Sequence, residues 1–168
     1  MDHATFDRLD ARITGWMAAR GITWLRVSVG VVFLWFGALK LVPGLSPAEE
    51  VAGRTFERLT FGAMPASVGV IVIGAWEVAI GVGLLTAWAL RATLLLLFVQ
   101  MVGALTPLVL FPGLCFERFP FVLTLLGQYI VKNAVLVSAA IAIGATVRGG
   151  GLSARRARPS VTSPPGRG

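Results

Sequence analysis

Long apolar segments alternate with shorter polar ones along this chain, and this pattern sets the fold class. Four apolar segments approach the roughly 20 residues that a helix needs to cross a hydrocarbon core of about 30 Å. They cover about residues 24–42, 66–88, 92–111 and 123–147. A membrane-spanning sheet would instead need many short segments of alternating polarity, closed into a barrel. The pattern therefore predicts an all-α integral membrane protein, built as a four-transmembrane-helix bundle.

The segments outside the spans predict three further features. Residues 1–21 place apolar side chains at helical spacing in a polar background, which is typical of an amphipathic helix at the membrane interface. A short soluble overhang is the alternative for this segment. In the loop 42–65, Glu49 and Glu50 suit the first turn of a short extracytoplasmic helix. The last segment is rich in Arg, Gly, Pro and Ser and predicts a disordered basic cytoplasmic tail. The chain thus divides into an interfacial segment (1–21), a membrane domain (22–148) and a tail (149–168).

The composition agrees with a bilayer as the main solvent and main partner. Hydrophobic residues make up 56% of the chain and charged residues 14%, with a mean hydropathy of +0.81, whereas a soluble domain is about half apolar and about a quarter charged. The net charge of +7 would suggest nucleic acid for a soluble protein. Here the basic residues flank apolar segments, so no nucleic-acid partner is expected.

The distribution of Lys and Arg predicts the orientation. Basic residues are concentrated in the N-terminal segment, in the turn around Arg91 and in the tail, and they are sparser in the other two loops. The positive-inside rule then places both termini in the cytoplasm. Arg26, near the inner end of the first span, is expected to snorkel to the headgroups.

Cysteine and histidine are too few for most cofactor chemistry. The chain has one Cys, Cys115, so it has no intramolecular disulfide and no CxxC pair. One His, His3, cannot supply bis-His haem ligation or a zinc site. We therefore expect no intrinsic cofactor and no metal site. Cys115 is interpreted as an inert loop thiol, and the alternative, a reactive thiol, would need a depressed pKa.

Polar residues inside the spans are the candidate site residues, because charges there usually face a bundle interior or a cavity. Counted from the outer end at about 1.5 Å per residue, Glu77 lies roughly 16 Å deep and Lys132 roughly 13 Å deep. A lysine stem bridges this difference, so we predict that Glu77 faces Lys132, with Gln128 and Asn133 beside it. Lys40, nearer the outer end of the first span, is expected to line the same outward-opening space without competing for Glu77.

Glycines at helical spacing predict where the spans approach one another. Gly30 and Gly37 share one face of the first span, and Gly74 and Gly81 share the face of Glu77 on the second. Because small residues let helix backbones come close in a membrane, we expect these four glycines to pack helices.

Several segments together resemble a known family. They are FLWFGALKLVPGLSPAEE, WEVAIGVGLL, TPLVLFPG and FPFVLTLLGQYIVKN, and the most specific pieces are FG-x-x-K-x-x-P and E-x-x-x-G-x-G-L-L. Over about residues 22–148 the chain resembles the DoxX-like family of small bacterial four-helix membrane proteins, in particular its YkgB-type branch. The resemblance implies a bundle in the bacterial inner membrane and a link to redox and oxidant-stress processes. One such process is carried out by a thiosulfate- or quinol-oxidising system with a membrane subunit of this family. The family's recurrent polar points fall on Lys40, Glu77 and Lys132.

Three functions are compatible with these features. The first is a redox-associated subunit whose polar pocket binds a quinone, a lipid or a similar small molecule. Because the chain itself lacks redox ligands, it would work with a redox partner protein and be at most a subunit of an oxidoreductase system. The second is an anchor or assembly factor for a partner complex or a homo-oligomer. The third is a small proton-coupled transporter, against which stand the predicted pairing of Glu77 with a lysine and the lack of an inverted repeat. A Glu77–Lys132 pair that only fixes helix register is the structural alternative to a pocket.

Overall fold

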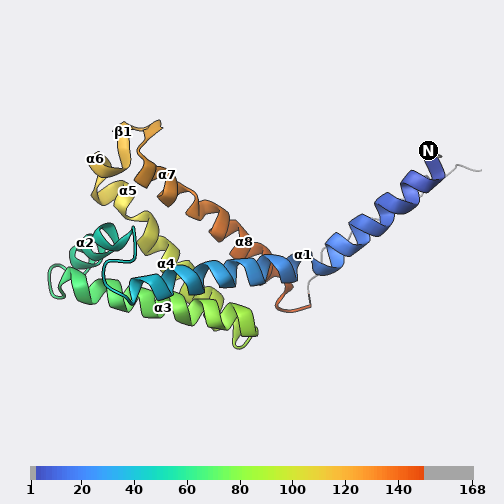
Figure 1. The fold of residues 1–168 in the computed structure, drawn as a ribbon, viewed down its shortest axis with the longest axis horizontal. Helices are drawn as coiled ribbons and strands as arrows, with labels where there is room; N and C mark the ends of the chain where they lie inside the picture. The colour runs from blue at the N-terminus through green and yellow to red at the C-terminus, as the bar shows by residue number, and fades with distance from the viewer. Residues whose placement is uncertain (1–2, 150–168) are drawn as a thin grey trace, which may run out of the picture.

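A computed structural model describes residues 3–149 of the chain, and these residues are mostly helical (Figure 1). The helices are α1 (His3–Lys40), α2 (Glu49–Leu59), α3 (Ala66–Thr86), α4 (Leu90–Leu105), α5 (Pro107–Leu110), α6 (Pro112–Cys115), α7 (Leu125–Val131) and α8 (Asn133–Thr146). A short antiparallel hairpin between α6 and α7 pairs β1 (Phe116–Arg118) with β2 (Val122–Leu123). Except for residue 149, the predicted tail lies outside the described residues.

Four helical stretches are long and apolar enough to cross a membrane, as the sequence predicts. They are Thr5–Lys40, Ala66–Thr86, Leu90–Leu110 and Leu125–Thr146. The third stretch is interrupted at Thr106, because the next residue is a proline without an amide hydrogen. The fourth is interrupted at Lys132, between α7 and α8. The chain is therefore a multi-pass membrane protein with two broken spans.

The N-terminal segment is the first half of a single helix, α1, which has 38 residues. At about 1.5 Å per residue such a helix is roughly 57 Å long, well beyond the roughly 30 Å of a hydrocarbon core. Every side chain from Thr5 to Arg20 is exposed, and Figure 1 shows this half of α1 projecting away from the other helices. Its apolar side chains include Phe6, Leu9, Ile13 and Trp16. Its attachment to the membrane surface stays a prediction.

Glycines bring α1 and α3 into close contact, and these two helices form the most extensive packing in the fold. A Cβ added to Gly37 would lie 2.8 Å from the Cβ of Glu77 and 2.9 Å from the carbonyl oxygen of Gly74. A Cβ added to Gly81 would lie 2.5 Å from the amide nitrogen of Leu34. All four glycines expected to pack helices are buried in this contact.

The hydrophobic core lies toward one end of the bundle, which we call the terminal end because the α3–α4 turn and the end of α8 lie there. The core draws on all four spans: Val29, Phe33, Ile80, Leu84, Leu94, Leu97, Met101, Ala139, Ala140 and Ile143. The opposite end, which we call the loop end, carries α2, α5, α6 and the hairpin. There α7 makes its main contacts with α4, α5 and α6, whereas α1 packs on α3 and α8. As a result α1 and α7 diverge toward the loop end (Figure 1).

Hydrogen bonds tie residues 107–131 into one unit, which we call the loop-end cap. The hydroxyl of Thr124 donates to the carbonyl oxygen of Leu114 at 2.7 Å. The amide of Thr124 donates to the carbonyl oxygen of Cys115 at 3.0 Å. The thiol of Cys115 donates to the carbonyl oxygen of Pro107 at 3.4 Å. Gly127 packs so closely that an added Cβ would lie 2.0 Å from the carbonyl oxygen of Cys115.

The α1–α3 contact predicts a strong position dependence for Gly→Ala substitutions. Gly81→Ala forces a methyl group against the backbone of Leu34 and is expected to lower stability by about 1–3 kcal/mol. Gly103→Ala is the matched control, since nothing lies within 4 Å of its added Cβ and alanine favours helix. Thermal unfolding in detergent, followed by circular dichroism, measures both. Equal stability of the two variants would contradict the close contact.

Candidate functional site

Three polar side chains from three spans meet inside the bundle and form what we call the Glu77 triad. The ammonium nitrogen of Lys40 lies 2.6 Å from Oε2 of Glu77. The amide nitrogen of Gln100 donates to Oε1 of Glu77 at 3.1 Å. Both carboxylate oxygens are therefore partnered, and the side chains of Lys40 and Glu77 are only 9% and 13% exposed. Such a buried ion pair is maintained by these contacts, because an unpaired charge is costly to remove from water.

The glycine contact positions the triad. Lys40 follows Gly37 by one helical turn and Glu77 follows Gly74 by one turn, so each charge continues its glycine face. A Cβ on Gly74 would lie 3.0 Å from the Cβ of Lys40, which places the lysine stem against the bare backbone of α3. Lys40 is also the last residue of α1, where the helix dipole favours a cation.

The predicted Glu77–Lys132 pair is wrong. Lys132 is exposed, and its ammonium nitrogen lies 5.0 Å from the ring centroid of Tyr129. Equal depth does not bring two side chains together here, because α7 diverges from the α1–α3 pair at this level. The expectation that Lys40 is too shallow to compete is also wrong, since its long stem reaches Glu77.

Gln100 completes the triad and was absent from the predicted pair. A signal for it was present in the sequence. Glu77 lies nine residues before Thr86, the end of α3, and Gln100 lies ten residues after Leu90, the start of α4. Both are therefore about 14–15 Å from the turn that joins these helices. Two polar residues at the same height on sequential antiparallel helices are candidates for contact.

The other predicted site residues lie on α7 and at the start of α8, away from Glu77. Gln128 is exposed and Asn133 is half-buried. The structure brings neither of them, nor Lys132, to the carboxylate of Glu77, whose hydrogen-bond partners among residues 3–149 are Lys40 and Gln100.

Arg26 caps α3, and its expected contact with the headgroups stays a prediction. Its guanidinium donates to the carbonyl oxygens of Leu84 and Leu85, the latter at 3.2 Å. These carbonyls belong to the last turn of α3, where the helix leaves acceptors without a partner. A cation is favoured there as well.

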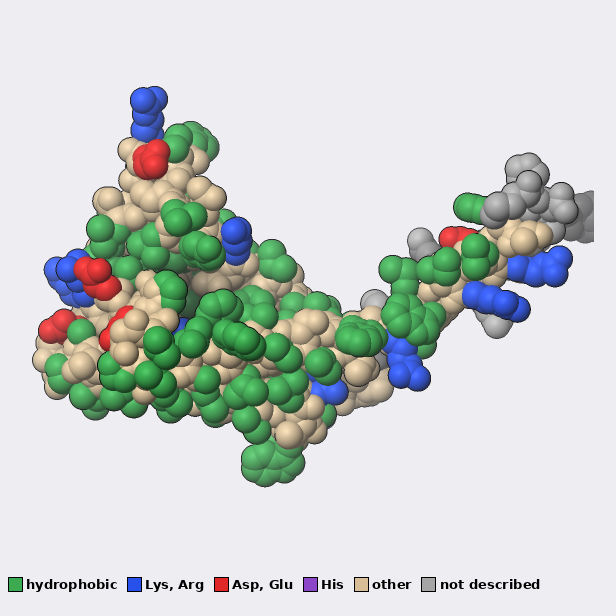
Figure 2. Space-filling view, in the orientation of Figure 1, with side chains coloured by type: hydrophobic (Ala, Val, Ile, Leu, Met, Phe, Trp, Pro, Cys, Tyr) green, Lys and Arg blue, Asp and Glu red, His purple; other side chains and the backbone are tan. Residues whose placement is uncertain are grey.

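A cleft opens on the loop-end side of the core. Figure 2 shows the surface hollowed between the part formed by α1 and α2 and the arm formed by α7 and α8. On α1, Val29 is buried at 4%, but Phe36, two turns further on the same face, is 52% exposed. Lys40 and Glu77 lie loopward of the core residues of α1 and α3, and Gln100 lies beside Met101, the last core residue of α4. We call this space the loop-end cleft.

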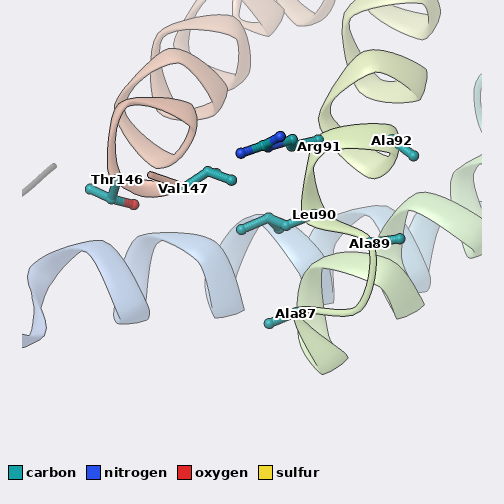
Figure 3. A pocket seen from close by; sticks show the side chains of 7 residues that line it. All are labelled: Ala87, Ala89, Leu90, Arg91, Ala92, Thr146 and Val147. Carbon is teal, nitrogen blue, oxygen red and sulfur yellow. The ribbon is translucent and has the colours of Figure 1, made fainter. Parts of the chain in front are cut away.

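A different pocket lies at the terminal end, far from the triad in the fold. It has a volume of about 650 Å³ and is shown in Figure 3. It is lined by Ala87, Ala89, Leu90, Arg91, Ala92, Thr146 and Val147. Most of these side chains are small and apolar, so few polar groups converge on it, and it is a weaker candidate than the triad.

Cys115 is fully buried at 0% exposure within the loop-end cap. Its thiol is hydrogen-bonded to Pro107, and burial raises the pKa of this thiol. Because the reactive species is the thiolate, a raised pKa lowers reactivity at neutral pH. This geometry favours the interpretation of Cys115 as a structural thiol. The described residues also hold no group of three or more His, Cys, Asp or Glu side chains that could bind a metal ion.

No family model, curated protein or solved structure matches this chain. The resemblance of its segments to the DoxX-like family therefore stays a prediction.

The ion pair predicts non-additive effects of substitution. Lys40→Met leaves the Glu77 carboxylate buried without a cation and is expected to cost about 3–5 kcal/mol of stability. The double variant Lys40→Met/Glu77→Met removes both charges and is expected to recover most of that loss. Unfolding of the two single variants and the double variant in detergent measures the coupling energy. Additive losses would show that the two charges do not interact.

Burial predicts that Cys115 resists alkylation in the folded protein. Because the pKa of its thiol is raised, reaction with a maleimide is expected to stay slow between about pH 7 and 8.5 and to become fast once the chain is unfolded. Cys115→Ala/Phe119→Cys is the matched control, since position 119 is 74% exposed. Mass spectrometry follows both reactions, and equal rates for the two folded proteins would contradict the buried thiol.

Proposed function

We propose that this chain is a DoxX-like membrane protein whose Glu77 triad forms an intramembrane site for the polar head of a small amphipathic molecule. A quinone is the ligand class that fits this site best. The observation that carries the proposal is the position of the triad, a buried ion pair with unused hydrogen-bonding capacity beside the loop-end cleft.

The triad has capacity left for a ligand. An ammonium group has three donors, and one donor of Lys40 is used by Glu77. The amide of Gln100 donates to Glu77, and its carbonyl oxygen accepts no hydrogen bond from the described residues. No fully buried side-chain nitrogen or oxygen in residues 3–149 lacks a partner, so the unpartnered carbonyl oxygen of Gln100 is accessible. A quinone carbonyl can accept from Lys40, and a quinol hydroxyl can donate to Gln100.

A role in fixing helix register alone explains the triad less well. A buried ion pair is often close to neutral in stability relative to apolar residues of the same size. The glycine contacts already set the register of α1 against α3, because an added Cβ at Gly37, Gly74 or Gly81 would lie within 3.0 Å of the facing helix. Ionisable groups within a span are by default candidates for a functional site.

A quinone site implies a partner. Among the described residues no cluster of metal ligands is present, and Cys115 is a single buried thiol. Electrons that reach or leave a bound quinone would therefore pass to a second protein. The chain would serve as the quinone-binding subunit of an oxidoreductase system in the bacterial inner membrane.

A second candidate function, an anchor for a partner complex, is favoured by exposed aromatic side chains at the loop end. Phe119 and Phe121 at the hairpin are 74% and 90% exposed, and Phe61 after α2 is 98% exposed. Exposed aromatic residues are frequent anchors of protein interfaces. A proton-coupled transporter is supported less well, because Lys40 and Gln100 already partner both carboxylate oxygens of Glu77.

The proposal predicts saturable quinone binding that depends on the triad. The full chain in phosphatidylcholine nanodiscs is expected to bind a decylbenzoquinone. Quenching of tryptophan fluorescence by the quinone measures this binding. Gln100→Leu removes the amide that faces the ligand head, and Lys40→Met removes both a donor to the head and the cation of the ion pair with Glu77. Each variant is expected to bind the quinone about tenfold more weakly or worse. Arg91→Gln, at the terminal end, is the matched control and should bind as the unmodified chain does. Absence of saturable binding, or equal affinity of all variants, would refute a quinone site at the triad.

A further inference from the structure

Lys132 is a charged residue within the fourth span that has no anionic partner among the described residues. It lies seven residues after Leu125, the start of that span, or about 10 Å along the helix. Its side chain is exposed, and its contact is with the ring of Tyr129. An ammonium group at such a depth normally faces a bundle interior or an aqueous cavity.

Lys132 stands at the interruption between α7 and α8. Leu136, Ala139 and Ile143 follow it at intervals of four, three and four residues, and in α8 these three share one face. Ala139 and Ile143 are buried in the core, and Leu136 packs against it. The buried face of α8 therefore leads toward Lys132, whereas the buried residues of α7 are Gly127 and Ile130. Lys132 itself is exposed, and it belongs to the arm of α7 and α8 that bounds the loop-end cleft.

Two helix interruptions join the loop-end cap to the rest of the protein. At the first, the amide of Thr106 donates to Gly103 at 3.2 Å, and Pro107 has no amide hydrogen. At the second, the amide of Val135 donates to the carbonyl oxygen of Lys132 at 3.0 Å. Both are three-residue bonds of the 3₁₀ type, which within a helix often mark hinges. The cap between them is held together by the bonds around Cys115 and Thr124, so it can move as one body.

We propose that the loop-end cap is a lid that closes on a ligand, and that Lys132 then donates a hydrogen bond to the ligand from the side opposite Lys40. This inference rests on the proposed function, and it narrows the ligand to molecules with two opposed acceptor oxygens. A benzoquinone carries such a pair, because its two carbonyl groups lie at opposite positions of one ring. One carbonyl would face the Glu77 triad and the other would face α7. Lys132 is then a ligand-binding residue that the open structure holds away from its partner.

Spin-label distances in the full chain test the closure. In a Cys115→Ala background, Phe36→Cys and Leu125→Cys place one label on each side of the cleft, since Leu125 lies two turns before Lys132 on the same face. Pulsed electron resonance in phosphatidylcholine nanodiscs measures the distance with and without decylbenzoquinone. A decyl aromatic ketone with one carbonyl is the matched probe. Quinone is expected to shorten the distance, and the ketone is expected to leave it unchanged.

Variants at Lys132 test its role in binding. Lys132→Met is expected to abolish the shortening of the distance and to weaken quinone binding about tenfold. Lys132→Arg and the control Arg91→Gln are each expected to keep the shortening and the affinity of the unmodified chain. Quinone binding with no change of distance, or with full affinity in Lys132→Met, would overturn the lid and leave the triad site standing. Equal closure by the ketone would overturn the requirement for two acceptors. No quinone binding by the unmodified chain would overturn both the triad site and the lid.

Discussion

The ion pair between Lys40 and Glu77, held in the glycine contact of α1 and α3, is the interaction on which the candidate site depends. Two charges leave water together only when they are close and well partnered, and the 2.6 Å contact and the amide of Gln100 meet that condition. The contact in turn requires α1 and α3 to approach closely, which Gly37 and Gly74 permit by having no side chain. Packing and electrostatics are thus coupled, because a larger residue at either glycine would separate the helices and leave the carboxylate without its cation.

The two ends of the bundle differ in a way that matters for function. At the terminal end all four spans share one apolar core, and Arg26 closes the last turn of α3. At the loop end α1 and α7 diverge, and the space between them holds polar groups at a depth where lipid would be a poor solvent for them. The bundle is thus closely packed at the terminal end and open between α1 and α7 at the loop end, which is the arrangement that the proposed ligand site requires. The same asymmetry explains why a lysine inside the fourth span is exposed.

The sequence predicts the four spans, the short helix α2 and the glycine faces well, because each follows from periodicity within one segment. It predicts the partner of Glu77 poorly. Depth can be counted along a single helix, but lateral position depends on how Pro107 and the break at Lys132 redirect the loop-end halves of two spans. A lysine stem also reaches more than one helical turn, so depth alone could not separate Lys40 from Lys132. Gln100 could have been found by matching heights on α3 and α4, whereas the capping role of Arg26 needed the crossing of α1 and α3.

A crystal structure of the full chain, grown without added ligand from a lipid phase, tests the central claim most directly. The carboxylate of Glu77 is expected to lie between the ammonium group of Lys40 and the amide of Gln100, with Lys132 across an open space on α7. Density that instead joins Glu77 to Lys132, with α7 packed against α3 and the cleft filled by side chains, would contradict the claim that the triad and the cleft form a ligand site.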